Sequence, residues 1–192
     1  MRALVVFGAA FGVLWFYLDR LGGQQNSAAD VVMIEANLAA QNLTGADVVN
    51  MTLSEAGLQA IAGREGFSAV RYRDSDGYSI GFGHFIQVGE SFNEPMSRED
   101  AEALLLADTE IAQKAVRAYV KVPLSQSNYD SLTSLVFNIG AGNFKKSRCL
   151  QKLNEGDYTG AANEAMGFNK SGGVYLAALD ARRTSEFQQF WA

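Results

Sequence analysis

The stretch from residue 64 to residue 84, REGFSAVRYRDSDGYSIGFGH, combines one glutamate, two aspartates, four glycines and the single histidine of the chain. It begins at the end of a helical pattern, because Leu58, Ile61 and Glu65 recur at the spacing of one helix face. Gly66 can then adopt the backbone conformation in which helices commonly end. A carboxyl group at the end of a buried helix face loses hydration, which favours its neutral form. These features make Glu65 a candidate general acid.

The periodicity then changes to that of β-strands. Residues 70–73 and 78–82 alternate in polarity on either side of an Asp-Gly pair, which predicts an antiparallel hairpin. Residues 85–88 are expected to add a third short strand. The helix, the small sheet and the helical patterns that follow predict an α+β fold.

Two aspartates lie at the predicted turn. Turn formation alone explains Asp76, because aspartate is a common turn residue. Asp74 lies where the first strand meets the turn, and Ser79 lies on the returning strand. A glutamate at a helix end and an aspartate in a hairpin could place two carboxyl groups on opposite sides of one groove.

The remainder of the chain has helical patterns. Ser97 is expected to open one helix that continues past Val116, and Ser125 is expected to cap another. Shorter helices are expected around Leu150, over 161–166 and over 176–190.

The N-terminus has a different composition. Residues 3–18 carry no charged side chain, and a membrane-spanning helix needs roughly 20 apolar residues. Trp15 and Tyr17 suit a membrane interface. We therefore expect an uncleaved membrane anchor over 1–20, in preference to a cleavable signal peptide. A tether with a short helix over 21–50 and a globular domain over 51–192 would follow.

The overall composition limits the possible functions. The 192 residues are 48% hydrophobic, and 16 basic and 21 acidic side chains give a net charge of −5, which disfavours nucleic acid as a partner. The single cysteine, Cys149, excludes an internal disulfide, and the single histidine, His84, excludes a histidine cluster for a metal. The sequence implies no cofactor.

Several motifs occur together in one order along the chain. They are Glu65-Gly66, Tyr72-Arg73-Asp74, Ile80-Gly81-Phe82-Gly83-His84, Phe137-Asn138-Ile139-Gly140, Leu153-Asn154-Glu155-Gly156-Asp157-Tyr158, Phe168-Asn169-Lys170-Ser171-Gly172-Gly173 and Arg182-Arg183. With these motifs the chain from about residue 53 to residue 191 resembles the bacteriophage lysozymes of the T4 and lambdoid-endolysin type, the muramidases of glycoside hydrolase family 24.

The resemblance implies a lysozyme-like fold, in which a small antiparallel sheet lobe joins a mainly helical C-terminal lobe. Here an N-terminal transmembrane helix would precede that domain. The implied activity is hydrolysis of the β-1,4 bond between N-acetylmuramic acid and N-acetylglucosamine in peptidoglycan, with inversion. Lambdoid relatives of this family use a weakly apolar signal-anchor that can leave the membrane.

The resemblance also implies residue roles. Glu65 would protonate the leaving oxygen, and Asp74 would stabilise charge at the anomeric carbon and help to place the attacking water. Ser79 stands where the family has a threonine, and the turn between Asp74 and Ser79 is one residue shorter than the family pattern. This shorter turn leaves Asp76 as the alternative to Asp74 for the second carboxylate, and we prefer Asp74.

Further residues are expected to support this site. The family pairs the histidine of its G-x-G-H motif with an aspartate, which predicts an ion pair between His84 and Asp108. Candidate substrate-binding residues are Phe82, Asn138, Phe168, Asn169 and Lys170.

Three alternatives remain open. A lambda-like lytic transglycosylase would need only Glu65, whereas Asp74 and Ser79 favour hydrolysis. A non-catalytic peptidoglycan-binding or structural virion protein could keep the fold without turnover. The expected location is the host inner membrane with the catalytic domain facing the periplasm, and the alternative is a phage membrane or entry device.

Overall fold

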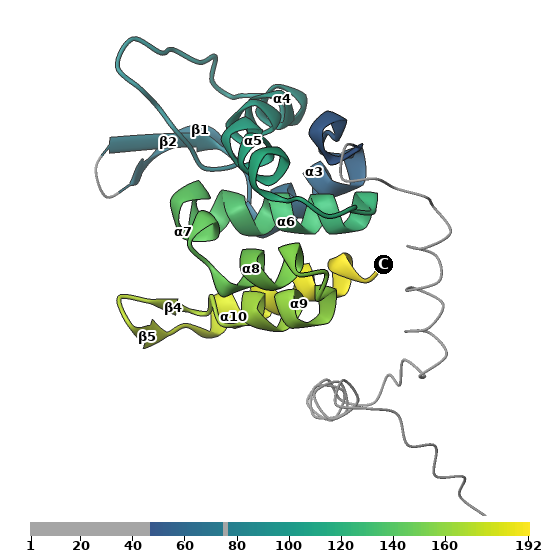
Figure 1. The fold of residues 1–192 in the computed structure, drawn as a ribbon. Helices are drawn as coiled ribbons and strands as arrows, with labels where there is room; N and C mark the ends of the chain where they lie inside the picture. Colours follow the sequence, from purple (N-terminus) through teal and green to yellow (C-terminus); the bar gives the residue numbers. More distant parts are fainter. Residues whose placement is uncertain (1–46, 75–76) are drawn as a thin grey trace, which may run out of the picture. The chain divides into compact units, whose positions relative to one another are not determined.

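The computed structural model describes residues 47–74 and 77–192, so the predicted anchor over 1–20 and most of the predicted tether lie outside the described residues. Within the described ranges, no helix is both long enough and apolar enough to cross a membrane. A three-stranded sheet and a two-stranded hairpin extend from a group of helices (Figure 1).

The first long helix, α3 (Glu55–Glu65), follows a 3-10 turn, η1 (Asp47–Asn50). Ser54 caps α3, since its Oγ accepts a hydrogen bond from the Gly57 amide at 3.0 Å. The same hydroxyl donates to Asp130, so the cap also ties α3 to a neighbouring helix. The helix ends at Gly66, whose φ of 76° favours glycine. This arrangement places Glu65 in the last turn of α3.

The sheet contains β1 (Ser68–Asp74), β2 (Gly77–Gly81) and β3 (His84–Phe85) in that order, with antiparallel pairing. Tyr72 lies opposite Ser79. The prediction of a third strand over 85–88 was too long. The chain turns after Ile86, because the Glu90 amide donates to the Gln87 carbonyl at 3.1 Å.

The next helical segment is divided. The sequence predicted one helix from Ser97 past Val116, but the structure has α4 (Arg98–Asp108) and α5 (Glu110–Tyr119). Thr109 separates them, and its buried hydroxyl donates to the Leu106 carbonyl at 2.7 Å. The helical segment is thus interrupted at a residue that is neither proline nor glycine, so the sequence carried no breaker signal there.

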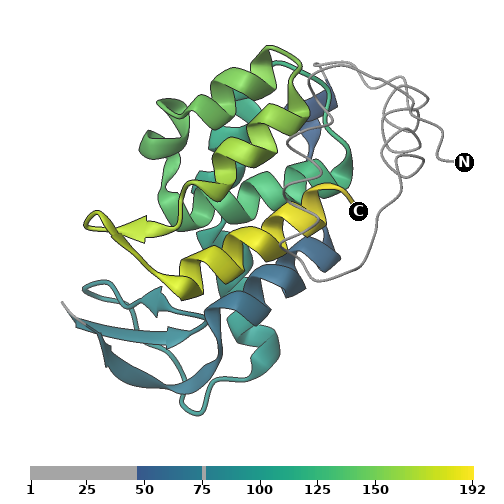
Figure 2. The ribbon, with the colours of Figure 1, turned by 90° about the horizontal axis from the view of Figure 1, so that it is seen from below.

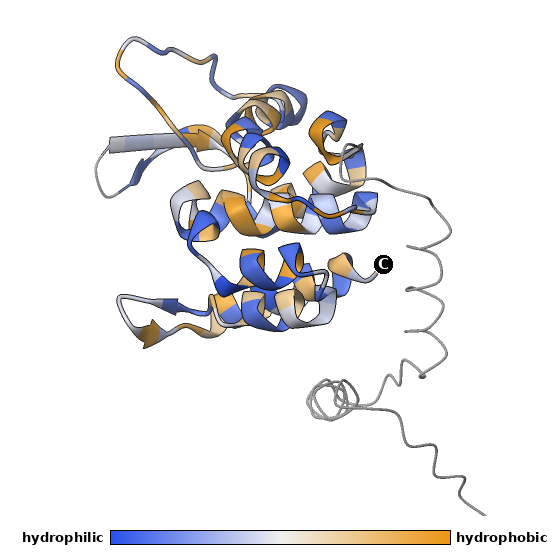
Figure 3. Ribbon diagram, viewed as in Figure 1, coloured by the Kyte–Doolittle hydropathy of each residue, from blue (hydrophilic) through white to orange (hydrophobic). Residues whose placement is uncertain are grey.

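The central helix, α6 (Gln126–Ile139), begins at Ser125 as predicted, with a reciprocal capping box formed by Ser125 and Asn128. Four further helices surround it: α7 (Ala141–Lys145), α8 (Arg148–Asn154), α9 (Tyr158–Met166) and α10 (Ala177–Phe190). Figure 3 shows hydrophobic residues along α6.

A hairpin that the sequence analysis did not predict joins α9 to α10. It consists of β4 (Lys170–Ser171) and β5 (Val174–Tyr175). Gly172 and Gly173 form its turn, with φ values of 55° and 83°, so the Gly-Gly pair was the available signal. In the views of Figures 1 and 2, this hairpin and the three-stranded sheet extend from the same side of the helices.

Two hydrophobic clusters stabilise the domain. The larger lies around α6 and includes Tyr129, Phe144 and Leu153. The smaller joins α3, β2 and α4 through Ile61, Ile80 and similar side chains. Because α3 and β2 share the smaller cluster, the end of α3 and the sheet are held in a fixed relation.

Candidate active site

Glu65 lies at the junction of α3 with the sheet, and its side chain is 23% exposed. Arg182 of α10 reaches it, with 2.7 Å between Arg182 Nη1 and Glu65 Oε1. Arg182 is therefore a direct partner of Glu65, which the helical pattern around Glu65 did not indicate.

Arg182 belongs to a buried polar network between α3, α6 and α10. Its Nε donates to Glu186 Oε1 at 3.1 Å, and Arg183 Nη2 donates to Asn138 Oδ1 at 2.9 Å. Arg182-Arg183 is one of the family motifs in the sequence, but its contact with Glu65 was not predicted. No local pattern predicted this contact, because the two residues lie on helices that are distant in sequence.

Asp74 and Ser79 form a second cluster on the sheet. Ser79 Oγ donates to Asp74 Oδ2 at 3.2 Å across β1 and β2. The Ser79 side chain is fully buried, so its hydroxyl is directed to the aspartate rather than to open solvent. This geometry suits Ser79 to orient the Asp74 carboxylate.

His84 lies between two acidic side chains. Its Nδ1 is 2.9 Å from Asp108 Oδ2 and its Nε2 is 3.0 Å from Glu90 Oε2. The expected contact with Asp108 is thus present, and Glu90 is an additional partner. Burial alone would lower the pKa of His84, but the hydrogen bonds to Glu90 and Asp108 outweigh burial and raise that pKa. The contact with Asp108 connects β3 to α4, so His84 has a structural role.

The candidate substrate-binding residues occupy different environments. Phe82 is buried in the smaller hydrophobic cluster, and its role in substrate binding stays a prediction. Asn138 lies exposed at the end of α6 and Phe168 is half-buried against the larger cluster. Asn169 Nδ2 donates to Asp180 Oδ1 at 3.0 Å, which anchors the base of the hairpin, and Lys170 is exposed on β4.

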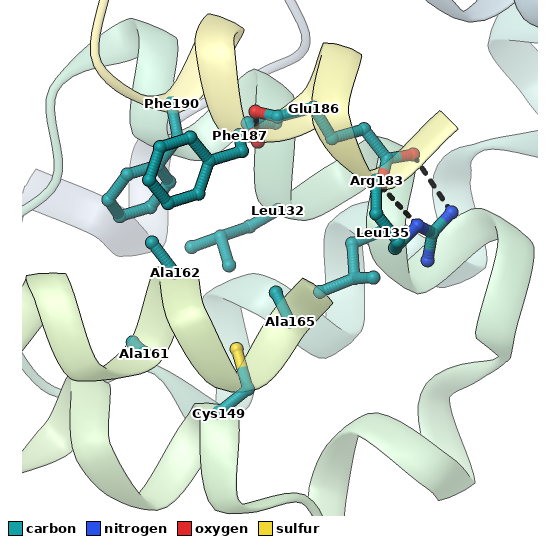
Figure 4. A pocket seen from close by; sticks show the side chains of 11 residues that line it. Leu132, Leu135, Cys149, Ala161, Ala162, Ala165, Arg183, Glu186, Phe187 and Phe190 are labelled. Carbon is teal, nitrogen blue, oxygen red and sulfur yellow. Dashed lines mark hydrogen bonds and ion pairs between the residues drawn. The ribbon is translucent and has the colours of Figure 1, made fainter. Parts of the chain in front are cut away.

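A small cavity between α6, α8, α9 and α10 borders the buried polar network, because Arg183 and Glu186 line it (Figure 4). Its volume is about 20 Å³, which compares with the space for roughly one water molecule. Cys149 lines it, and burial raises the pKa of this thiol to about 12, so the thiol is unreactive near neutral pH. The cavity is too small for a sugar ring.

Residues 62–186 match the family model for phage lysozyme. The chain is 37% identical over 141 residues to an endolysin of Bacillus phage B103, a match covering 71% of this chain. It spans about half of that relative's length, 52%. A SAR-endolysin of Enterobacteria phage P21 is 32% identical over 128 residues, covering 65% of this chain and 75% of the relative.

The solved structures agree with this family match. A crystal structure of a variant of the P22 lysozyme superimposes with a TM-score of 0.68 at 34% identity, and the match covers 74% of this chain and 99% of the P22 chain. The segment over 62–186 that the family model matches contains Glu65, Asp74 and Ser79. The chain therefore belongs to the phage lysozyme family of glycoside hydrolases.

Proposed function

We propose that this protein is a lysozyme that hydrolyses the β-1,4 bond between N-acetylmuramic acid and N-acetylglucosamine in peptidoglycan. The observation that carries this proposal is the hydrogen bond between Ser79 and Asp74, in a family member whose Glu65 ends the adjacent helix. Two carboxyl groups and a water molecule are sufficient for this type of glycoside hydrolysis.

Glu65 is the general acid in this proposal. Its carboxyl proton passes to the glycosidic oxygen as the bond between that oxygen and the anomeric carbon breaks. The developing positive charge on the sugar is stabilised by the Asp74 carboxylate, which also accepts a proton from the attacking water. Ser79 orients Asp74 through its hydroxyl, and the family resemblance implies inversion at the anomeric carbon.

The Asp74–Ser79 pair favours hydrolysis over lytic transglycosylation. A transglycosylase closes a ring within the muramic acid and has no need to place an external water molecule. An aspartate carboxylate that a neighbouring hydroxyl holds in place supports a role in placing that water.

The experiment is reducing-end release from purified Gram-negative peptidoglycan by the full-length chain. Glu65→Gln removes the transferable proton, so we expect its rate to fall about a thousandfold. Glu55→Gln, at the exposed first turn of the same helix, is the matched control and should keep the wild-type rate. Equal rates for wild type and Glu65→Gln would exclude Glu65 as the acid.

We also propose that residues 1–20 anchor the chain in the host inner membrane, with a tether over 21–50 and a catalytic domain over 51–192 in the periplasm. The uncharged run over 3–18 and the name of the P21 SAR-endolysin relative support this organisation. Protease added to spheroplasts should remove the catalytic domain from intact membranes. Protection from the protease until the cells are lysed would place the domain in the cytoplasm and contradict the proposal.

A further inference from the structure

Arg182 of α10 contacts two carboxylates, that of Glu65 at the end of α3 and that of Glu186 in its own helix. Arg182 Nη1 lies 2.7 Å from Glu65 Oε1, while its Nε lies 3.1 Å from Glu186 Oε1. The Arg182 side chain is only 10% exposed. A partly buried guanidinium that bridges two carboxylates divides its attraction between them, so the state of Glu186 influences Glu65.

Glu186 is fixed more firmly than Glu65. Its side chain is 5% exposed, and it accepts a hydrogen bond from Ser134 Oγ at 2.7 Å. Arg183 Nε lies 3.0 Å from its Oε2, and Figure 4 shows this pairing beside the small cavity. Bonds from both sides therefore hold the Glu186 carboxylate in one orientation, and that orientation determines the position of Arg182.

The network has an excess of positive charge. Its charged groups are Glu65 and Arg64 of α3, together with Arg182, Arg183 and Glu186 of α10, and Arg64 and Arg183 both interact electrostatically with Glu65. The α6 helix contributes the neutral side chains of Ser134 and Asn138. Three guanidinium groups thus face two carboxylates. Without Glu186, the same three cations would face the Glu65 carboxylate alone.

Burial strengthens the electrostatic effect of Glu186 on the neighbouring arginines. Desolvation lowers the pKa of Arg64 and Arg183, and the negative charge of Glu186 opposes that lowering in both cases. Electrostatic interactions are screened less in a buried network than at the surface.

We propose that Glu186 is a positioning residue for Glu65, which fixes Arg182 and takes up part of its charge so that Glu65 can hold a proton near neutral pH. This inference rests on the proposed role of Glu65 as the general acid. Glu186 itself contacts no substrate in this account and acts through Arg182.

The test is the pH profile of kcat/KM for peptidoglycan, measured on the full-length chain. A general acid must be protonated, so activity is lost as pH rises through its titration. In Glu186→Gln, the alkaline fall of kcat/KM (its alkaline limb) should occur about one pH unit lower than in the wild type. At pH values above the wild-type midpoint, kcat/KM should therefore be approximately tenfold lower. Glu186→Asp keeps the charge but withdraws it from Arg182, so its limb should move in the same direction by less.

Ser131→Ala is the structural control. Ser131 Oγ donates to the Glu186 backbone carbonyl at 2.7 Å, so this change weakens the same helix contact without altering any charge. We expect a lower melting temperature and an unmoved alkaline limb. An unmoved limb in folded Glu186→Gln would overturn the proposal. If Glu186→Gln does not fold, an unmoved limb in Glu186→Asp would overturn it equally.

A second measurement separates this inference from the proposed function. The pH midpoint of the Glu65 carboxyl carbon signal, followed by NMR in the wild type and the Glu186 variants, requires no turnover. If the wild type releases no products but the midpoint still moves lower without Glu186, the proposed function fails and the coupling stands. If the wild type is active and neither the midpoint nor the limb moves, the coupling fails and the proposed function stands.

Discussion

Glu65 and Asp74 are held in very different ways. Glu65 lies at the end of a helix and contacts a buried network of arginines that links α3 to α10. Asp74 is exposed at the end of β1, where Ser79 of the neighbouring strand donates to it. The two proposed catalytic roles therefore require different environments from the fold. A proton donor needs a controlled electrostatic environment, whereas a carboxylate that attracts water and positive charge benefits from solvent access.

The largest effect in the sheet is expected for Asp74→Asn. The amide keeps the shape but loses the negative charge that opposes the developing cation, so the rate of reducing-end release should fall about a hundredfold. Asp100→Asn, at the exposed first turn of α4, serves as a control for a surface aspartate. A wild-type rate in Asp74→Asn would remove Asp74 from the mechanism and leave Glu65 as the sole proposed catalytic group.

Ser79→Ala should have a smaller effect on the same rate. It removes one hydrogen bond to Asp74 but leaves the carboxylate, and a hydrogen bond of about 1 kcal/mol corresponds to roughly a fivefold change. The loss should disappear when Asp74→Asn is already present, because Ser79 acts through Asp74. Full additivity of the two changes would show that Ser79 has an independent role.

The smallest effect on activity is expected at His84 and Asp108, which connect the sheet to α4. Since the pKa of His84 is raised in the folded state, its contribution to stability is complete below its unfolded value, near 6.5. That contribution is lost as pH rises through the folded value. Asp108→Asn should therefore lower the free energy of unfolding by about 2 kcal/mol near pH 5.5, and by less near pH 9.

Chemical denaturation at the two pH values measures this difference. Glu102→Gln breaks an i,i+4 surface pair with Arg98 and should cost roughly 0.5 kcal/mol or less at both values. An equal loss at both pH values in Asp108→Asn would mean that the charge on His84 contributes nothing to the connection.

The sequence predicted those features that depend on neighbouring residues. Ser125 and the helix that it caps followed from local capping chemistry, and the hairpin around residue 77 followed from alternation and an Asp-Gly pair. The break at Thr109 was missed because the apolar spacing of α4 continues into α5. The β4–β5 hairpin was missed because its strands have only two residues each, too few to show a period.

In the candidate site, too, the features that depend on neighbouring residues were predicted and the contacts between distant helices were not. Glu65, Asp74 and Ser79 were selected from local pattern and family resemblance, and Asp74 and Ser79 contact each other in the structure. Phe82 enters the smaller hydrophobic cluster, which the alternation over residues 78–82 did not reveal, and its role in substrate binding stays a prediction. The bridge from Glu186 through Arg182 to Glu65 depends on the packing of α10 against α3, which no local sequence signal encodes.

The most direct test of the central claim is digestion of peptidoglycan in ¹⁸O-labelled water, followed by mass spectrometry of the muropeptides. We expect the wild type to release N-acetylmuramic acid with a free reducing end that carries one ¹⁸O atom, and Glu65→Gln to release almost none. Products that end in unlabelled 1,6-anhydro-muramic acid would contradict it, because they would show that no water molecule attacks the sugar.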